Sequence, residues 1–412
     1  MMAVHGGPRA REINRGQLID AIRGAGQISR VELVRQMGSN AATVSTVVRE
    51  LIDDGLVTES GRAQSTGGKP RVLLSLIPDA CFALGVGLDH AGISYVVTNL
   101  GGAVVGRLRR RGTGADDPGT VVARIGEEMM SLADHVGVER ERLLGVGVVS
   151  PGPVTASTGI ALTPPVMDAW RHYPLVEALT ASTGLPVLTE NDASAAAVGE
   201  YWSGLAGGSR CFAALYMGTG LGAGVMNDGI VYRGASGNTG EVGHLCVDID
   251  GPLCWCGGNG CVEIMAGPTA VVAEARRQGR HLPGLSVTED FSTLVRMARG
   301  GDEVALELLT RSARYVAVAA QALANVLDPD LIVLTGPSFR LAGSLYLPII
   351  RERLDTAFFA RDCHPVDVVL SPNAAEAAAI GGAALVLQRE LAPHMTPLGP
   401  PSTRSTRRRV AV

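Results

Sequence analysis

Residues 240–263, GEVGHLCVDIDGPLCWCGGNGCVE, are the most informative stretch of this sequence. Cys254, Cys256 and Cys261 lie within eight residues of one another, and His244 stands ten residues upstream of the first of them. Three thiolates and one imidazole complete a tetrahedral shell for Zn²⁺, and the intervening glycines let the chain fold tightly around an ion. Because four protein ligands leave no open position for water, the stretch predicts a structural zinc ion that orders a loop.

Two carboxylates accompany the predicted zinc loop. Glu241 precedes His244 by one helical turn, and Glu263 follows Cys261 by two residues. Acids held rigidly beside a cleft suit polyhydroxylated ligands, because one carboxylate accepts hydrogen bonds from two neighbouring hydroxyls. An isolated glutamate is usually a solvent-exposed acid, but two of them beside a metal loop favour a sugar-like ligand.

The zinc loop lies within a long region, residues 75–390, in which strand-like and helix-like segments alternate. Segment 82–89, for example, is rich in Val, Leu and Gly, whereas segment 120–137 has helical spacing of its apolar residues. This alternation is typical of α/β architecture. Two successive sets of strands predict two lobes, and the cleft between such lobes commonly binds a small ligand.

One predicted strand ends at a polar pair within LTENDASAAAVGE, residues 188–200. Asn191 and Asp192 stand where this strand passes into a helix of small residues. An aspartate at the end of a strand, facing a cleft, can accept a hydroxyl proton as a general base. It can equally cap the helix or bind a ligand hydroxyl, and these residues alone leave the alternatives open.

Two loops bear on phosphate binding. MGTGLGAGVMNDG, residues 217–229, is a glycine-rich hairpin that could surround a phosphate with backbone N–H groups and one hydroxyl. GLDHAGIS, residues 87–94, follows a buried strand but carries side chains where backbone N–H groups would have to approach an anion. The candidate nucleotide-binding residues of the hairpin are Gly218, Thr219, Gly220 and Gly222.

Length and composition exclude several classes of protein. The chain has 412 residues, of which 46% are hydrophobic, so it is long enough for two or three domains with substantial cores. It contains no run of about 18 uncharged apolar residues and begins without an apolar signal segment, so we expect a cytoplasmic protein without a membrane span. Seven cysteines in a chain of this length do not form a disulfide scaffold.

Residues 14–74 predict a winged helix-turn-helix. Ser29 and Glu32 match a capping box, and Asn40 precedes a helix with a stripe of buried valines. Two strands around a polar, glycine-rich loop follow as the wing. Residues 1–71 carry a net charge of +3 and the remainder −7, which favours DNA as the partner of this module, whose second helix would enter the major groove. The expected DNA contacts are Asn40, Ala41, Ala42, Thr43, Ser45, Thr46, Arg49, Lys69 and Arg71.

Together these motifs resemble the ROK family of repressors, open reading frames and kinases, specifically its transcriptional regulators. The resemblance covers nearly all of residues 14–390. It implies an actin-like, two-lobed sugar-kinase (ATPase) fold at 75–390 after the winged helix-turn-helix. Residues 1–13 and 391–412 are predicted to be flexible tails, the second of them rich in Pro, Ser and Arg. The implied ligands of Zn²⁺, in a loop at 244–261, are His244, Cys254, Cys256 and Cys261. The implied sugar contacts are Asn191, Asp192, Glu241, His244 and Glu263, and Asp192 would be the base in a kinase of the family.

The sequence departs from the family's kinases at the first phosphate loop. The kinases carry Asp-x-Gly-Gly-Thr, whereas Asp89-His90-Ala91-Gly92-Ile93 lacks the paired glycine and the threonine. A hydrogen bond to a charged group contributes about 1.5–3 kcal/mol, so each lost contact should lower ATP affinity by about one to two decades. The second loop retains Thr219, so the sequence still allows weak nucleotide binding.

We therefore expect a sugar-responsive transcriptional regulator, most simply a repressor. It would bind a double-stranded DNA operator as a homodimer or homotetramer, with a sugar or sugar phosphate as effector. One alternative is a sugar kinase of the glucokinase or N-acetylhexosamine kinase type that uses ATP and Mg²⁺ and also carries a DNA-binding module. Another is a constitutive DNA-binding protein whose body binds no sugar.

Overall fold

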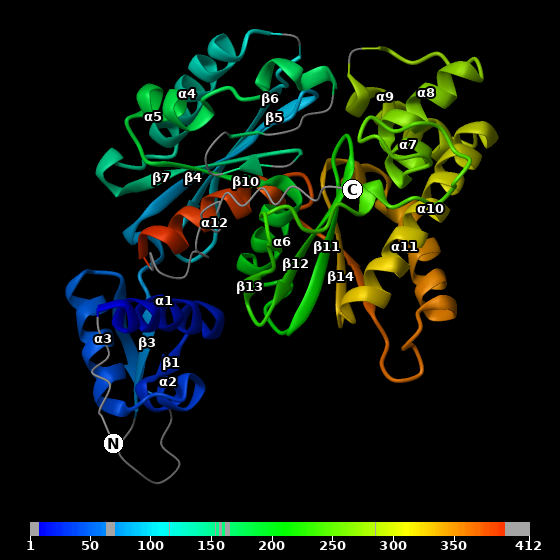
Figure 1. The fold of residues 1–412 in the computed structure, drawn as a ribbon. Coiled ribbons are helices and arrows are strands. Elements are labelled where there is room, and N and C mark those ends of the chain that lie inside the picture. The colour runs from blue at the N-terminus through cyan, green and yellow to red at the C-terminus, as the bar shows by residue number, and fades with distance from the viewer. Residues whose placement is uncertain are drawn as a thin grey trace, which may run out of the picture.

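Figure 1 shows the computed structural model, which describes residues 8–62, 71–114, 116–152, 154–155, 159–160, 165–284 and 286–391. A small N-terminal module, drawn in blue, lies beneath the first of two larger lobes, and the second lobe lies beside the first. None of the helices in these ranges combines the length and the apolar character needed to cross a membrane.

The N-terminal module contains three helices and a three-stranded antiparallel sheet in the order β1-β3-β2. It has the helices and the two wing strands that the sequence predicts, whereas the two-residue strand β1 is too short to leave a pattern. Its elements are α1 (Pro8–Ala25), β1 (Ile28–Ser29), α2 (Arg30–Met37), α3 (Ala41–Asp53), β2 (Val57–Arg62) and β3 (Val72–Leu76).

Local hydrogen bonds explain where the second and third helices begin. The N–H of Glu32 donates to Ser29 Oγ at 3.4 Å, and the N–H of Ser29 donates to Glu32 Oε2 at 2.9 Å, which completes the predicted capping box. The N–H of Thr43 donates to Asn40 Oδ1 at 2.7 Å and starts α3. The predicted apolar stripe of α3 is buried at Val44, Val47, Val48 and Leu51.

The module begins earlier than the sequence predicts. Residues 8–13, which we expected in a flexible tail, belong to α1, and Pro8 stands in its first position, where a missing N–H breaks no hydrogen bond. At the other end of the chain, the last helix extends to Leu391. The remaining residues of both expected tails, and Lys69 in the wing, lie outside the described residues.

The first lobe is built on a five-stranded sheet in the order β6-β5-β4-β7-β10. Strands β4, β7 and β10 are parallel, while β5 and β6 are antiparallel to their neighbours, and α4 and α5 cover one face. Its main elements are β4 (Phe82–Gly87), β5 (Gly92–Asn99), β6 (Val104–Arg111), α4 (Pro118–His135), β7 (Leu143–Ser150), α5 (Leu175–Thr183) and β10 (Val187–Asn191). Its shorter elements are η1 (Pro78–Ala80), η2 (Arg140–Arg142), η3 (Pro165–Trp170) and the strand pair β8 (Val154–Thr155) and β9 (Gly159–Ile160).

The second lobe repeats this arrangement in the order β13-β12-β11-β14-β15, again with three parallel strands on one side. Its strands are β11 (Cys211–Met217), β12 (Leu221–Asn227), β13 (Ile230–Val231), β14 (Leu331–Thr335) and β15 (Asp367–Leu370). Its helices are η4 (Val242–His244), α7 (Val262–Ala266), α8 (Pro268–Arg277), α9 (Val287–Arg299), α10 (Glu303–Leu327) and α11 (Pro337–Ala357). The repeated sheet order confirms the predicted two-lobed α/β fold.

Two helices, α6 (Asp192–Trp202) and α12 (Ala377–Leu391), pack against each other between the sheets. Each follows the last strand of one lobe and packs on the other lobe: α6 on β11 and β12, and α12 on β4 and β7. Their backbones approach closely at Gly381, where a Cβ atom would overlap the carbonyl oxygen of Ala195. The lobes are therefore joined by a helix pair, and a displacement of one lobe acts directly on both helices.

Candidate functional site

The two lobes surround a cavity of about 720 Å³. Its wall contains every body residue that the sequence analysis assigned to sugar or phosphate binding. The first lobe contributes the end of β10, and the second lobe contributes the β11–β12 turn and the zinc loop. The predicted residues in the wall are Asn191, Asp192, Gly218, Thr219, Gly220, Gly222, Glu241, His244 and Glu263.

Asn191 and Asp192 connect β10 to α6 at this wall. Asn191 is the N-cap of α6, because its Oδ1 accepts a hydrogen bond from the N–H of Ser194 at 3.0 Å. Burial, together with the charges of Asp89 and Glu241, raises the pKa of Asp192 to about 8. At neutral pH this carboxyl is mainly protonated, so it can donate a hydrogen bond to a ligand oxygen.

The raised pKa of Asp192 predicts that the protein loses stability as pH rises. The folded state retains a proton that the unfolded state releases near pH 4, so the free energy of unfolding should decrease between about pH 4 and pH 8. One such group contributes a slope of at most about 1.4 kcal/mol per pH unit. Urea unfolding at several pH values should show a steeper decrease in the wild type than in Asp192→Asn. Exposed Asp134→Asn should keep the wild-type slope, and an equal slope in Asp192→Asn would contradict the prediction.

Glu263 is held in place by two donors. Trp255 Nε1 donates to its Oε1 at 2.8 Å, and the N–H of Leu221 donates to its Oε2 at 3.2 Å. The Trp255 ring also packs edge-on against the His244 ring, with centroids 5.0 Å apart. Burial and the neighbouring Glu263 raise the pKa of Glu241 to about 7. Sequence analysis missed Trp255, although a tryptophan between two metal-type cysteines was a usable signal.

A direct hydrogen bond joins the two phosphate loops. Thr219 Oγ1 donates to Asp89 Oδ2 at 3.3 Å, and the N–H of Ala91 donates to Asp89 Oδ1 at 3.0 Å. Burial alone would raise the pKa of Asp89. The His90 imidazole, whose Nδ1 lies 3.0 Å from Asp89 Oδ1, and hydrogen bonds from Ala91 and Thr219 outweigh it and hold this pKa below its usual range. Ile93, at the position of the kinases' threonine, is fully buried. The hydroxyl expected to contact a phosphate is therefore bonded to an anionic carboxylate.

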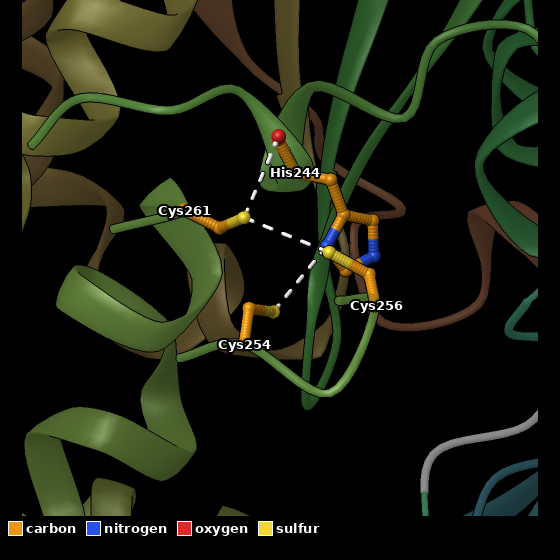
Figure 2. A group of neighbouring side chains, drawn as sticks. All are labelled: His244, Cys254, Cys256 and Cys261. Carbon is orange, nitrogen blue, oxygen red and sulfur yellow. Dashed lines mark hydrogen bonds between the residues drawn. The ribbon is translucent and has the colours of Figure 1, made fainter. Parts of the chain in front are cut away.

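The predicted metal ligands converge in the second lobe, as Figure 2 shows for His244, Cys254, Cys256 and Cys261. One donor atom from each residue lies within 4.8 Å of the others. The sulfurs of Cys256 and Cys261 are 3.7 Å apart, and Cys254 Sγ lies 3.7 Å from His244 Nδ1. A tetrahedral site with Zn–S bonds of about 2.3 Å has S–S edges of about 3.8 Å, so this donor set fits zinc.

Comparison with known proteins identifies the family of the body. Residues 86–389 match the ROK family. The chain belongs to this family. The match contains both lobes and the cysteine cluster, and it leaves the N-terminal module as an addition to the ROK body.

Two ROK relatives match nearly the whole chain, including the N-terminal module, whereas a third matches about three quarters of it. A putative xylose repressor from Caldicellulosiruptor sp. (strain Rt8B.4) is 28% identical over 400 residues, which cover 93% of this chain and 97% of the relative. A solved ROK family transcriptional regulator, a homologue of the E. coli MLC protein, has a TM-score of 0.73 at 26% identity and covers 94% of this chain and 98% of its own. A ROK family glucokinase from Streptomyces griseus, solved with glucose and AMPPNP, has a TM-score of 0.64 at 28% identity and covers 74% of this chain and 98% of its own.

The expected DNA contacts within the described residues are accessible to solvent. Ala41, Ala42, Arg49 and Arg71 are exposed, and none of the other expected contacts within the described residues is buried. Two of the polar side chains are hydrogen-bonded within α3. Asn40 caps the helix. The Thr46 hydroxyl likewise donates to the carbonyl oxygen of Ala42 at 3.0 Å.

The cavity wall also contains residues that the sequence analysis did not select. They come from α8, α9 and α10, which pack against one another in the second lobe of this ROK body. These helices carry no motif, and only the fold brings them to the cavity. Polar examples are Thr269, Glu274, Arg277, Arg311 and Ser312.

Proposed function

We propose that this ROK protein is a sugar-responsive transcriptional repressor. One observation carries the proposal: a winged helix-turn-helix shares a continuous hydrophobic core with a body whose cavity contains the expected sugar contacts. The match of a putative xylose repressor to 93% of the chain supports it further. Such a regulator would act in the cytoplasm, where its operator is found.

The effector is a sugar or sugar phosphate in the cavity between the lobes. Protonated Asp192 donates a hydrogen bond to a ligand hydroxyl, and Asn191 and Glu241 supply further polar atoms beside it. His244 turns Nδ1 towards the thiols, which leaves its Nε2 for the sugar. Trp255 orients the carboxylate of Glu263, whose oxygens accept hydrogen bonds from sugar hydroxyls. Because relatives of this chain are named xylose repressors, D-xylose is the first sugar to test.

The cysteine cluster holds Zn²⁺ through His244, Cys254, Cys256 and Cys261. With four protein ligands the ion is structural, and its contribution is to fix the loop that carries His244 and Trp255 of the cavity wall. Trp255 lies between two of the ligands. The metal and the sugar site are therefore coupled through the shape of one loop.

The DNA-binding surface is the exposed face of α3 together with the wing. Small side chains of α3 contact base edges, namely those of Ala41, Ala42, Thr43, Ser45 and Thr46. Arg49, Lys69 and Arg71 contact phosphates, and the cap residue Asn40 lies at the end of α3 that enters the groove. A homodimer or homotetramer would place two such modules on a two-fold related operator.

A sugar kinase using ATP and Mg²⁺ is the second candidate, because Asp192 and the loop around Gly218, Thr219, Gly220 and Gly222 are retained at the cavity. Two features favour a binding protein instead. The Thr219 hydroxyl is bonded to Asp89, and Ile93 supplies no hydroxyl.

The proposal predicts that a sugar changes operator affinity. The wild-type protein should select a specific duplex from random-sequence DNA, and one sugar of a panel should change its affinity for that duplex by about 5–150-fold, measured by fluorescence anisotropy. Arg49→Ala should weaken DNA binding and leave sugar binding unchanged. Operator affinity that no sugar alters, or sugar phosphorylation that Asp192→Asn abolishes, would contradict the proposal, the second in favour of a kinase.

A further inference from the structure

Helix α6 runs from the cavity to the N-terminal module. Its first residue, Asp192, lies in the cavity wall, and its last residue, Trp202, meets α1 of the module. The helix has 11 residues and therefore spans about 16 Å. In Figure 1 the module lies on the side of the body where α6 and α12 pack together.

Arg23, in the last turn of α1, forms the contact with the far end of α6. Its Nη1 donates to the carbonyl oxygen of Trp202 at 3.0 Å, and its guanidinium carbon lies 4.2 Å from the centroid of the Trp202 ring and 5.6 Å from that of Tyr201. The side chain is only 7% exposed. A cation is favoured at the C-terminal end of a helix and over aromatic faces, so this contact sets where α1 sits on the body.

The contact between α1 and α6 around Arg23 leaves two buried hydrogen-bond donors without acceptors in the described part of the chain. Asp20 Oδ1 lies 3.6 Å from Nη2 of Arg23, which is a loose ion pair. Arg23 Nε and Trp202 Nε1 are both buried, and neither has a hydrogen-bond partner among the residues that the structure describes. A buried donor without an acceptor destabilises the arrangement that contains it, which lowers the free-energy cost of leaving this docking geometry.

Helix α6 itself is packed too tightly to bend. Nearly all of its residues are buried, and a Cβ atom at Gly224 of β12 would overlap the carbonyl oxygen of Ala193. On its other side it contacts α12 along the close approach at Gly381. Because packed elements shift as rigid units, a movement of the lobes around a ligand displaces both ends of α6 together.

We propose that Arg23 is the positioning residue through which α6 transmits occupancy of the cavity to the DNA-binding module. A ligand bound at Asp192 shifts α6, and Trp202 then carries Arg23 and α1 with it. Since α2 and α3 pack on α1, their orientation relative to the body changes. This inference rests on the proposed function and adds the physical route by which the sugar acts on DNA.

The test measures how a sugar changes DNA affinity when Arg23 is altered. Full-length wild type, Arg23→Ala, Arg23→Lys and Arg15→Ala are titrated with the duplex selected by the wild type. Titrations are made with and without D-xylose, D-glucose, N-acetyl-D-glucosamine and glucose 6-phosphate. Arg15 is the matched control, because it lies on the same helix but pairs with Asp54 inside the module. Sugar binding to each variant is measured separately by calorimetry.

We expect Arg23→Ala to bind the sugar alone and the duplex alone as the wild type does. The effect of the sugar on DNA affinity should fall to less than about twofold, compared with about 5–150-fold for typical coupled sites. Arg23→Lys keeps the charge without the planar stack and should retain part of the effect, which also provides the test if Arg23→Ala does not fold. Arg15→Ala should respond as the wild type does.

The outcomes separate this inference from the proposed function. A wild type that responds to sugar, with Arg23→Ala and Arg23→Lys responding equally, overturns the route through Arg23 and leaves the repressor intact. A wild type whose DNA affinity no sugar changes overturns both. Equal loss of response in Arg15→Ala and Arg23→Ala also overturns the route, because the effect would then belong to α1 in general.

Discussion

Cys256→Ser is expected to remove zinc and to weaken sugar binding together. Cys256 is exposed, so the change from sulfur to oxygen disturbs little packing and acts mainly through the lost metal ligand. A ligand that binds only the folded state at about a thousand times its Kd stabilises that state by about 4 kcal/mol, and a similar loss is expected here. Urea unfolding, metal content by atomic absorption and calorimetric sugar titration provide the three measurements.

Sugar affinity should decrease because the zinc loop carries cavity residues. Trp255 lies between two ligands and donates to Glu263, so a loosened loop releases both. We expect at least a tenfold loss of sugar affinity, which corresponds to about 1.4 kcal/mol. Cys246→Ser is the control, since Cys246 is exposed in the same loop but lies outside the cluster of four ligands. Unchanged stability and sugar affinity in Cys256→Ser would show that the cluster has no structural role.

The sequence predicted the parts of the site that are concentrated in motifs. His244 and the three cysteines lie close in sequence, and their chemistry alone defines the donor set. Asn191 and Asp192 were recognisable because a strand passes into a small-residue helix there. The same residues left the role of Asp192 open, because its raised pKa depends on burial and on the charges of Asp89 and Glu241, which only the folded chain brings about.

Other features could not be predicted because their signals are dispersed along the chain. β6 carries four arginines at its exposed positions, so its sequence resembles a charged loop more than a strand. α11 contains Pro348 in its interior, which in sequence argues against a helix. The Asp89–Thr219 bond joins residues 130 positions apart. The contact between Arg23 and Trp202 likewise depends on how two separately folded units dock.

Gly381→Ala is expected to cause a large loss of stability. A Cβ atom there would overlap the backbone carbonyl of Ala195, and backbone cannot move aside as a flexible side chain can. The helices α6 and α12 would have to separate along a contact that joins both lobes. Overpacking usually costs about 1–3 kcal/mol, and we expect at least about 3 kcal/mol because two helices must shift.

Gly24→Ala is the matched control for this prediction, because it places the same methyl group in a helix with open space. Gly24 lies in α1, and nothing lies within 4 Å of the position that a Cβ atom would take there, so alanine should stabilise the protein by about 0.5–1 kcal/mol. Urea unfolding of both variants gives the comparison. Separation of α6 from α12 also displaces Asp192, so sugar affinity should fall in Gly381→Ala alone. If Gly381→Ala were as stable as the wild type, α6 and α12 could not be the tightly packed joint that couples the two lobes.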